Sequence, residues 1–154
     1  MKLLGSQIQN GDVFTFRGDW FESRVIRWWT GQPVSHAGLA YWVGSRLFLL
    51  ETMSGYGLRL LPLTEAVKHY GQVFLQKNLM NGSRCLDWAL EQWGARYPNL
   101  WQLLRKTGRG LHCAELVAGA LAAAGFTCPK PPKQTTPGDL WSFECLTFPE
   151  ELSL

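Results

Sequence analysis

Three reactive side chains stand far apart in this chain: His36 within Ser-His-Ala-Gly, Glu51 after an apolar run, and Cys113 at the start of another apolar run. A cysteine, a histidine that takes its proton and a polar group that orients the histidine together make a nucleophilic thiol site. Taken singly, each has an ordinary explanation, since a cysteine heading an apolar helix is often a small core residue and a strand histidine beside a glutamate is often a surface pair. The elements that position the three residues decide between these interpretations.

Two runs rich in aliphatic and aromatic residues, 34–43 and 46–52, predict a β-hairpin. The Gly-Ser dipeptide between them suits a two-residue turn with glycine first. This turn pairs Val43 with Arg46, and every other pairing follows by counting away from it.

The same count puts His36 and Glu51 on one face of the hairpin. Gly38 falls opposite Glu51, and His36 is the diagonal neighbour of Glu51 on the same face, because side chains alternate along a strand. Their Cβ atoms are then about 7 to 8 Å apart, within reach of two long side chains. Gly38 is expected to leave room for this contact. A carboxylate there would fix the imidazole tautomer and favour the protonated ring.

The segment from His112 to Ala124 has the apolar spacing of a helix. Its apolar stripe must face the sheet, so we expect the helix to aim Cys113 at the face that carries His36 and Glu51. A sulfur in the first turn lies near the positive end of the helix dipole, and a nearby histidine lowers the thiol pKa further. Free backbone N–H groups at the helix start are suited to stabilise an oxyanion. The stripe comprises Cys113, Leu116, Val117, Ala120, Leu121 and Ala124.

The remaining pattern predicts short strands and helices in mixed order. Asp19, with Glu22 three residues later, is expected to cap a helix that runs through Thr30. Further strands are expected at 13–16, 72–77 and 143–148, further helices at 64–70, 86–93 and 100–106, and loops at 54–57 and 128–138.

Length and composition indicate one folded domain that covers residues 1–154. Hydrophobic residues make up 46% and charged residues 18%, with no long run of like charge, which argues against disorder. The net charge is +3, but Lys and Arg are scattered, so no nucleic-acid partner is expected. The first residues are too polar for a signal peptide and no spanning helix is expected, which makes the cytoplasm the default compartment and leaves export by another route open.

Cysteine and tryptophan usage narrows the chemistry further. The four cysteines, at 85, 113, 128 and 145, match neither zinc-ligand spacing nor a secreted disulfide framework, so we expect free thiols and no metal or organic cofactor. The chain also holds eight Trp, several of them in and near the first helix. Core packing is the ordinary reason for Trp, and contact with an apolar substrate or a membrane surface is the alternative.

Read in order, the motifs resemble the permuted papain-like thiol hydrolases of the NlpC/P60 superfamily, in the YiiX/YebB-like branch related to lecithin retinol acyltransferase. The chain order of histidine before cysteine is the reverse of the papain order and fits a permuted branch. Ala114 stands where the family commonly has Ser. The matching segments are Gly11-Asp12-Val13-Phe14, Ser35-His36-Ala37-Gly38-Leu39, Leu50-Glu51-Thr52, His112-Cys113-Ala114-Glu115-Leu116-Val117 and Thr136-Pro137-Gly138-Asp139-Leu140.

This resemblance implies a circularly permuted papain-like fold of the α+β class, with a small antiparallel sheet packed against the nucleophile helix. It implies Cys113 as nucleophile, His36 as general base and acid, and Glu51 as the residue that orients His36. Gly94-Ala95-Arg96-Tyr97 is similar to the Gly-x-x-Tyr that precedes the cysteine helix in these proteins, which implies that the Tyr97 hydroxyl assists the oxyanion.

The immediate neighbours of the three residues are expected to contact substrate. They are Ser35, Gly38 and His112, and we expect His112 to be a partly exposed residue at the helix start. The first functional hypothesis is a cysteine amidase or peptidase that forms an acyl-enzyme on peptidoglycan-type or other short peptides. The second is a lipid esterase or acyltransferase, which the Trp-rich first helix favours. The third is a binding or assembly module that keeps the fold without catalysis.

Overall fold

A six-stranded antiparallel sheet forms the centre of the protein, as seen in a computed structural model that describes residues 7–99, 102 and 110–152. The strand order is β4-β3-β2-β1-β5-β6. The strands are β1 (Val13–Arg17), β2 (His36–Val43), β3 (Arg46–Met53), β4 (Gly57–Pro62), β5 (Gln72–Gln76) and β6 (Glu150–Leu152). The α-helices are α1 (Phe21–Thr30), α2 (Leu63–Tyr70), α3 (Gly82–Glu91) and α5 (Cys113–Ala123), and two 3-10 helices are η2 (Pro132–Gln134) and η3 (Pro137–Ser142). The α+β class is as the sequence predicts.

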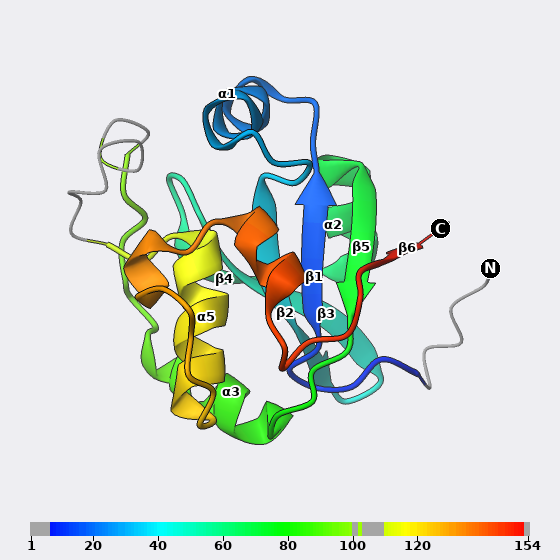
Figure 1. Cartoon of the computed structure of the whole chain (residues 1–154). Coiled ribbons are helices and arrows are strands. Elements are labelled where there is room, and N and C mark those ends of the chain that lie inside the picture. Colours follow the sequence, from blue (N-terminus) through cyan, green and yellow to red (C-terminus); the bar gives the residue numbers. More distant parts are fainter. Residues whose placement is uncertain (1–6, 100–101, 103–109, 153–154) are drawn as a thin grey trace.

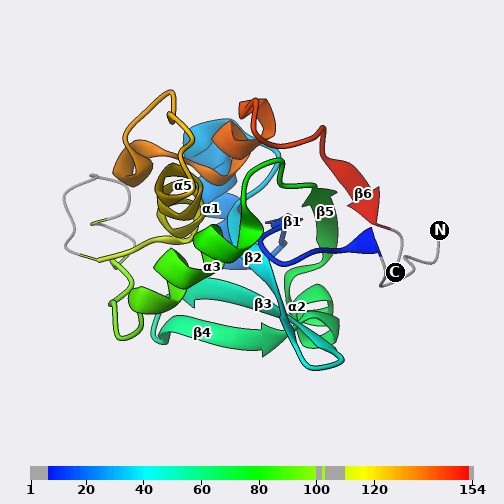
Figure 2. The same cartoon turned by 90° about the horizontal axis from the view of Figure 1, so that it is seen from below.

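Helices cover the two faces of the sheet unequally. The helix α5 lies in front of the sheet and α2 behind it (Figure 1), and α3 runs beside α5 (Figure 2). On the α5 face, Leu39 and Leu50 pack with Leu116, Val117 and other residues of one apolar cluster. A second cluster lies on the α2 face and joins Phe14, Phe16, Leu49, Ala66 and Tyr70.

The predicted hairpin and its register are confirmed. The pairs run from Val43 with Arg46 to Leu39 with Leu50. Gly44 turns the chain with a φ of +59°, a backbone conformation that glycine adopts without strain.

One strand was missed by sequence reasoning. β4 covers residues expected to be the end of a loop and the approach to a helix, and it pairs with β3 from Met53 opposite Gly57 to Phe48 opposite Pro62. A proline at the end of an edge strand costs little, because its missing N–H is not needed by a further neighbour. Pro62 can therefore end β4 without disturbing the sheet.

Two further predictions are wrong. The last strand is β6 rather than 143–148, because Thr136 and Asp139 form a capping box that starts η3 and Leu146 makes only an isolated bridge with Asn78. Asp19 does not cap α1: Trp20 is the N-cap residue without a side-chain hydrogen bond, and the Asp19 side chain is 97% exposed. The helix expected at 100–106 lies almost entirely outside the described residues.

Candidate active site

His36 and Glu51 form a buried ion pair. The Nε2 atom of His36 lies 2.5 Å from Oε2 of Glu51, and the side chains are 4% and 0% exposed. The other carboxylate oxygen, Oε1, accepts hydrogen bonds from Nε of Arg59 and from the Tyr70 hydroxyl, each at 2.8 Å. The predicted contact between histidine and glutamate is therefore present, with two partners that the sequence did not predict.

Gly38 serves a purpose different from the one expected. A Cβ atom added there would lie 2.6 Å from Cδ1 of Leu49 and 2.8 Å from the carbonyl oxygen of Leu50. The missing side chain thus makes room for Leu49 and for the backbone of Leu50, and its expected benefit to the pair of His36 and Glu51 stays a prediction. Gly38 is buried inside the sheet and is not among the residues that line the cavity at Cys113. Its prediction as a substrate-binding residue is not supported by this location.

The prediction of which face of the sheet α5 packs against is wrong. The apolar stripe of α5 packs on the face of Leu39 and Leu50, whereas His36 and Glu51 lie on the opposite face beside Tyr70. His36 begins β2 and Cys113 begins α5. The two residues meet where these elements begin, so the thiol approaches the imidazole around the end of the strand.

The charges of Cys113 and His36 stabilise each other. Burial by itself raises the pKa of the Cys113 thiol, but the charge of His36, together with hydrogen bonds to His112 and His36, lowers it to about 5. Burial by itself lowers the pKa of His36, but the charges of Glu51 and Cys113 raise it to about 10. Near neutral pH this arrangement favours a thiolate beside an imidazolium, which is the reactive form of a nucleophilic cysteine.

The first turn of α5 is fixed by His112. Its Nδ1 accepts a hydrogen bond from the backbone N–H of Glu115 at 3.2 Å, and the Glu115 side chain accepts one from the His112 backbone, completing a capping box. Nε2 lies 3.0 Å from the carbonyl oxygen of Lys133. This geometry assigns the Nε2–H tautomer, which donates to that carbonyl. His112 is buried, with 9% exposure, so the expectation of a partly exposed residue is wrong.

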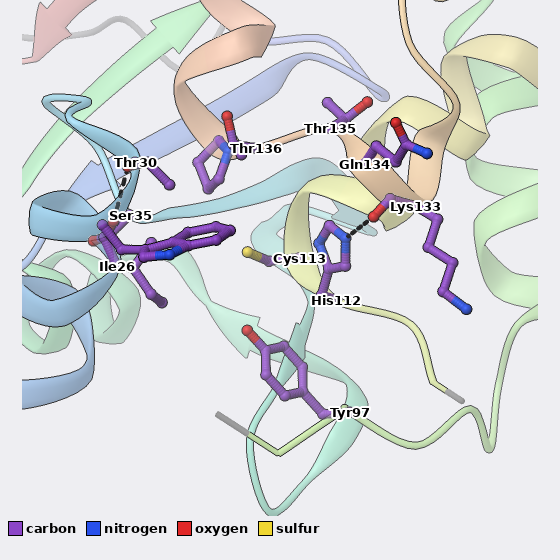
Figure 3. Close-up of a pocket in the computed structure, with 12 residues that line it drawn as sticks. Ile26, Thr30, Ser35, Tyr97, His112, Cys113, Lys133, Gln134, Thr135 and Thr136 are labelled. Atoms are coloured by element: carbon purple, nitrogen blue, oxygen red, sulfur yellow. Dashed lines mark hydrogen bonds between the residues drawn. The ribbon is translucent and has the colours of Figure 1, made fainter. Parts of the chain in front are cut away.

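Tyr97 points its hydroxyl oxygen toward the sulfur of Cys113 (Figure 3). Burial, and then the negative charge of Cys113, raise the pKa of the phenol well above its usual value. The hydroxyl therefore stays protonated and can donate a hydrogen bond at the thiol. This position agrees with the role that the resemblance implies for Tyr97.

A small cavity of about 40 Å³ opens at Cys113 between α1 and the segment around η2 (Figure 3). Of the predicted site residues, Ser35, Tyr97, His112 and Cys113 line this cavity. Tyr97 also borders a larger hollow of about 550 Å³ that includes Tyr56 and Trp93. The remaining lining of the small cavity consists of Ile26, Trp29, Thr30, Lys133, Gln134, Thr135, Thr136 and Pro137.

Hydrogen bonds hold both walls of the small cavity. Ser23, the buried residue of α1, donates to the Gly18 carbonyl at 2.7 Å and shares a short hydrogen bond with the Ser35 hydroxyl. Gln32 accepts from the Thr136 hydroxyl at 2.6 Å and from the Gly138 backbone at 3.1 Å. The end of α1 is thereby linked to the start of η3.

Arg59 and Tyr70 are the functional candidates that sequence reasoning missed. Tyr70 stacks on His36 with ring centroids 4.5 Å apart. Arg59 lies directly opposite Glu51 on β4. Recognising β4 would have found Arg59, because cross-strand pairing with Glu51 then follows from the register.

The fold and the site together define an α+β protein with a candidate Cys-His-Glu thiol site. The chain is similar in fold to the crystal structure of metalloprotein YiiX from Escherichia coli O157:H7 (DUF1105), with a TM-score of 0.71 over 96% of this chain and 97% of that chain. Sequence identity is 15%, so the likeness shows a shared fold. No protein-family model and no curated protein matches the chain.

YiiX is described as a metalloprotein, which raises the question of a metal here. Among the residues that the structure describes, no three side chains of His, Cys, Asp or Glu converge as metal ligands. The residues present therefore do not fit such a site, and the chemistry below uses the side chains of the chain itself. Within the same residues, no helix has the length and apolar character needed to cross a membrane.

Proposed function

We propose that the protein is a cysteine hydrolase of the permuted papain-like NlpC/P60 type, which cleaves an amide bond through an acyl-enzyme. The observation that carries this proposal is the grouping of Cys113, His36 and Glu51. Burial raises the pKa of the Cys113 thiol, but the charge of His36 lowers it by more, to about 5. Strongly perturbed pKa values of this kind cluster at catalytic sites.

The reaction follows from the resting charges. The thiolate of Cys113 attacks the carbonyl carbon, and the carbonyl oxygen becomes an oxyanion. The carbon–nitrogen bond then breaks, and the amine leaves with the proton of His36. Water next attacks the thioester while His36 takes a proton from it, the carboxylic acid is released, and the thiolate beside the imidazolium is restored.

Two groups are suited to stabilise the oxyanion. The backbone N–H of Cys113 belongs to the first turn of α5, where N–H groups have no partner within the helix. The Tyr97 hydroxyl points at the sulfur and remains protonated. Both groups are held before the substrate arrives, so they need no reorganisation during the reaction.

Tyr97 lines two hollows, which favours a substrate with a group on each side of the scissile bond. The small cavity includes Ile26 and Trp29 and suits a compact acyl group, and the larger hollow beside Tyr56 and Trp93 has room for the leaving group. A short peptide, including a peptidoglycan-type peptide, has this shape.

A lipid ester is the second candidate substrate, and one observation favours it. The helix α1, which supplies Ile26 and Trp29 to the cavity, also exposes Phe21 by 76% and Trp28 by 83%. Exposed aromatic side chains beside a site are typical of proteins that act at an apolar surface. The third candidate is a protein that keeps this fold but catalyses no reaction, and it would be a binding or assembly module.

Alkylation by iodoacetamide, followed by mass spectrometry, tests the thiol chemistry. We expect one cysteine, Cys113, to react well below pH 7, and Cys113→Ala to remove that reaction. Cys128→Ser is the matched control, because burial raises the pKa of the Cys128 thiol. Reaction of Cys113 only in alkaline solution would overturn the proposal.

A second experiment distinguishes the candidate substrates. The protein is incubated with peptidoglycan fragments and with phospholipid vesicles, and the masses of the products show which of the two is cleaved. Turnover of neither would favour the binding module.

A further inference from the structure

We propose that Arg59 is a positioning residue that acts through Glu51: it keeps this carboxylate ionised while His36 gains and loses its proton. The proposal rests on the proposed thiol chemistry and adds a residue to it. Arg59 touches neither Cys113 nor the cavity beside it in the described structure, so its effect must pass through its partners.

The location of Glu51 creates the need for a second cation. Its side chain is fully buried, and a buried carboxylate is costly unless charged or hydrogen-bonding partners compensate it. His36 is a positive partner only when it is protonated. When His36 gives its proton to a leaving group, a glutamate with no other cation would tend to take up a proton, because burial by itself raises the pKa of the Glu51 carboxyl.

Arg59 meets this need at every stage of the cycle, since a guanidinium is always charged in proteins. Its Nε lies 2.8 Å from Oε1 of Glu51, and the residue is the direct partner of Glu51 in the pairing of β3 with β4. The pairing of β3 with β4 therefore fixes the position of Arg59 and the side of the sheet on which its side chain lies. The guanidinium carbon of Arg59 also lies 4.5 Å from the centroid of the Tyr56 ring, a cation–π contact that adds a second support for its position.

Arg59 also orients Tyr70. Its Nη2 lies 3.3 Å from the Tyr70 oxygen, and because a guanidinium only donates, that oxygen must accept. The Tyr70 hydrogen is then directed at Oε1 of Glu51, 2.8 Å away. Arg59 is thus one of the two donors to Oε1 and orients the other, the Tyr70 hydroxyl. The other carboxylate oxygen, Oε2, bonds to His36.

These contacts give a chain of alternating charges: Arg59 positive, Glu51 negative, His36 positive and Cys113 negative. Removing Arg59 is expected to raise the thiol pKa through the protonation of Glu51. If Glu51 takes up a proton, His36 loses its partner, becomes neutral more easily and stabilises the thiolate less.

A double-mutant cycle with Arg59→Gln and Glu51→Gln tests the proposal, with the iodoacetamide rate of Cys113 measured against pH. We expect Arg59→Gln to raise the thiol pKa by about one unit, seen as a roughly fivefold slower reaction at about pH 5. In the Glu51→Gln background the same change should add little, because the effect passes through Glu51. Arg59→Lys keeps the charge and should restore most of the rate, and Arg46→Gln, an exposed arginine of the same sheet, is the control.

Equal shifts in both backgrounds, or none in either, would overturn the proposal. If Arg59→Gln does not fold, the cycle is run with Arg59→Lys, whose single ammonium cannot bond to Glu51 and Tyr70 as the guanidinium does. A smaller shift is then expected, again only where Glu51 is present. A wild-type thiol with an ordinary pKa would instead contradict the proposed function itself, so the two failures are distinguishable.

Discussion

The two faces of the sheet contribute to the candidate site in opposite ways. On the α5 face the sheet meets an apolar helix, and the contact between Leu50 and Leu116 belongs to an ordinary core. On the α2 face the core is interrupted by Glu51, which is fully buried and bonded to three donors. The first face packs against the helix that begins at Cys113, and the second carries the charged groups that lower the pKa of the Cys113 thiol.

This difference teaches that position and reactivity have separate origins in this protein. The α5 face is expected to tolerate apolar substitutions that preserve volume, because dispersion and burial have little directional preference. The α2 face tolerates few, because each donor on Glu51 has one geometry. The predictions that follow test this separation by changing one face at a time.

The largest effect is expected from His36→Ala, which removes the main cause of the low thiol pKa. The thiol pKa should rise from about 5 toward the ordinary value of 9.0. Iodoacetamide labelling at about pH 6 should then slow by roughly two to three orders of magnitude. A labelling rate within a factor of about two of wild type would show that the helix dipole, not His36, sets the reactivity.

On the α5 face, Leu116→Ala should lower stability without changing the thiol. Leu116 is fully buried, and this truncation typically costs about 2 to 5 kcal/mol. Urea unfolding measures that cost, and labelling of the folded protein should keep its pH profile. Leu49→Ala, a fully buried leucine on the α2 face, is the matched control of equal chemistry. A shift of the thiol pKa by Leu116→Ala would contradict the separation of roles.

Gly38→Ala should destabilise the protein by about 1 to 3 kcal/mol, because the added methyl group meets Leu49 and the backbone of Leu50. The closest atoms to that methyl group belong to Leu49 and Leu50 and not to His36 or Glu51, so the labelling profile should be preserved. Combining it with Leu49→Ala should recover part of the loss, as measured by urea unfolding. A loss of thiol reactivity in Gly38→Ala would instead support the original idea that this glycine makes room for the ion pair.

The smallest effect is expected in the pH dependence of wild-type stability. Cys113 and Glu51 have lowered pKa values, so their contributions are present at higher pH and are lost as pH falls, through about 5 for Cys113. The pKa of His36 is raised to about 10, so its contribution is present below 6.5 and is lost as pH rises through about 10. Urea midpoints measured across this range should fall at both ends. Leu116→Ala should lower the curve without changing its shape, whereas His36→Ala should flatten its alkaline end.

Local signals in the sequence were sufficient for the parts of the site that depend on few residues. The turn at Gly44 fixes the hairpin register, and the register brings His36 beside Glu51. The helix that begins at Cys113 followed from its apolar spacing, and the position of Tyr97 followed from a motif.

The features that were not predicted from the sequence depend on contacts between distant segments. Nothing local decides on which face of the sheet α5 packs, since its stripe fits either apolar surface. Arg59 could not be assigned because no strand was predicted between the loop at 54–57 and the helix at 64–70. The capping of α1 by Trp20 involves no side-chain hydrogen bond that a motif could encode. The charge network on the α2 face was therefore hidden although the sequence predicted its two central members.

The bridge made by Gln32 has a consequence for selectivity. One amide side chain joins the end of α1 to the start of η3, two segments that come from opposite ends of the chain. The small cavity at Cys113 is lined from both segments, by Thr30 on one side and by Thr136 on the other, so this one side chain ties two of its walls together. Under the proposed chemistry, the length of this tether would bear on which acyl groups fit beside Cys113, at a position that bonds to none of the residues of the charge network.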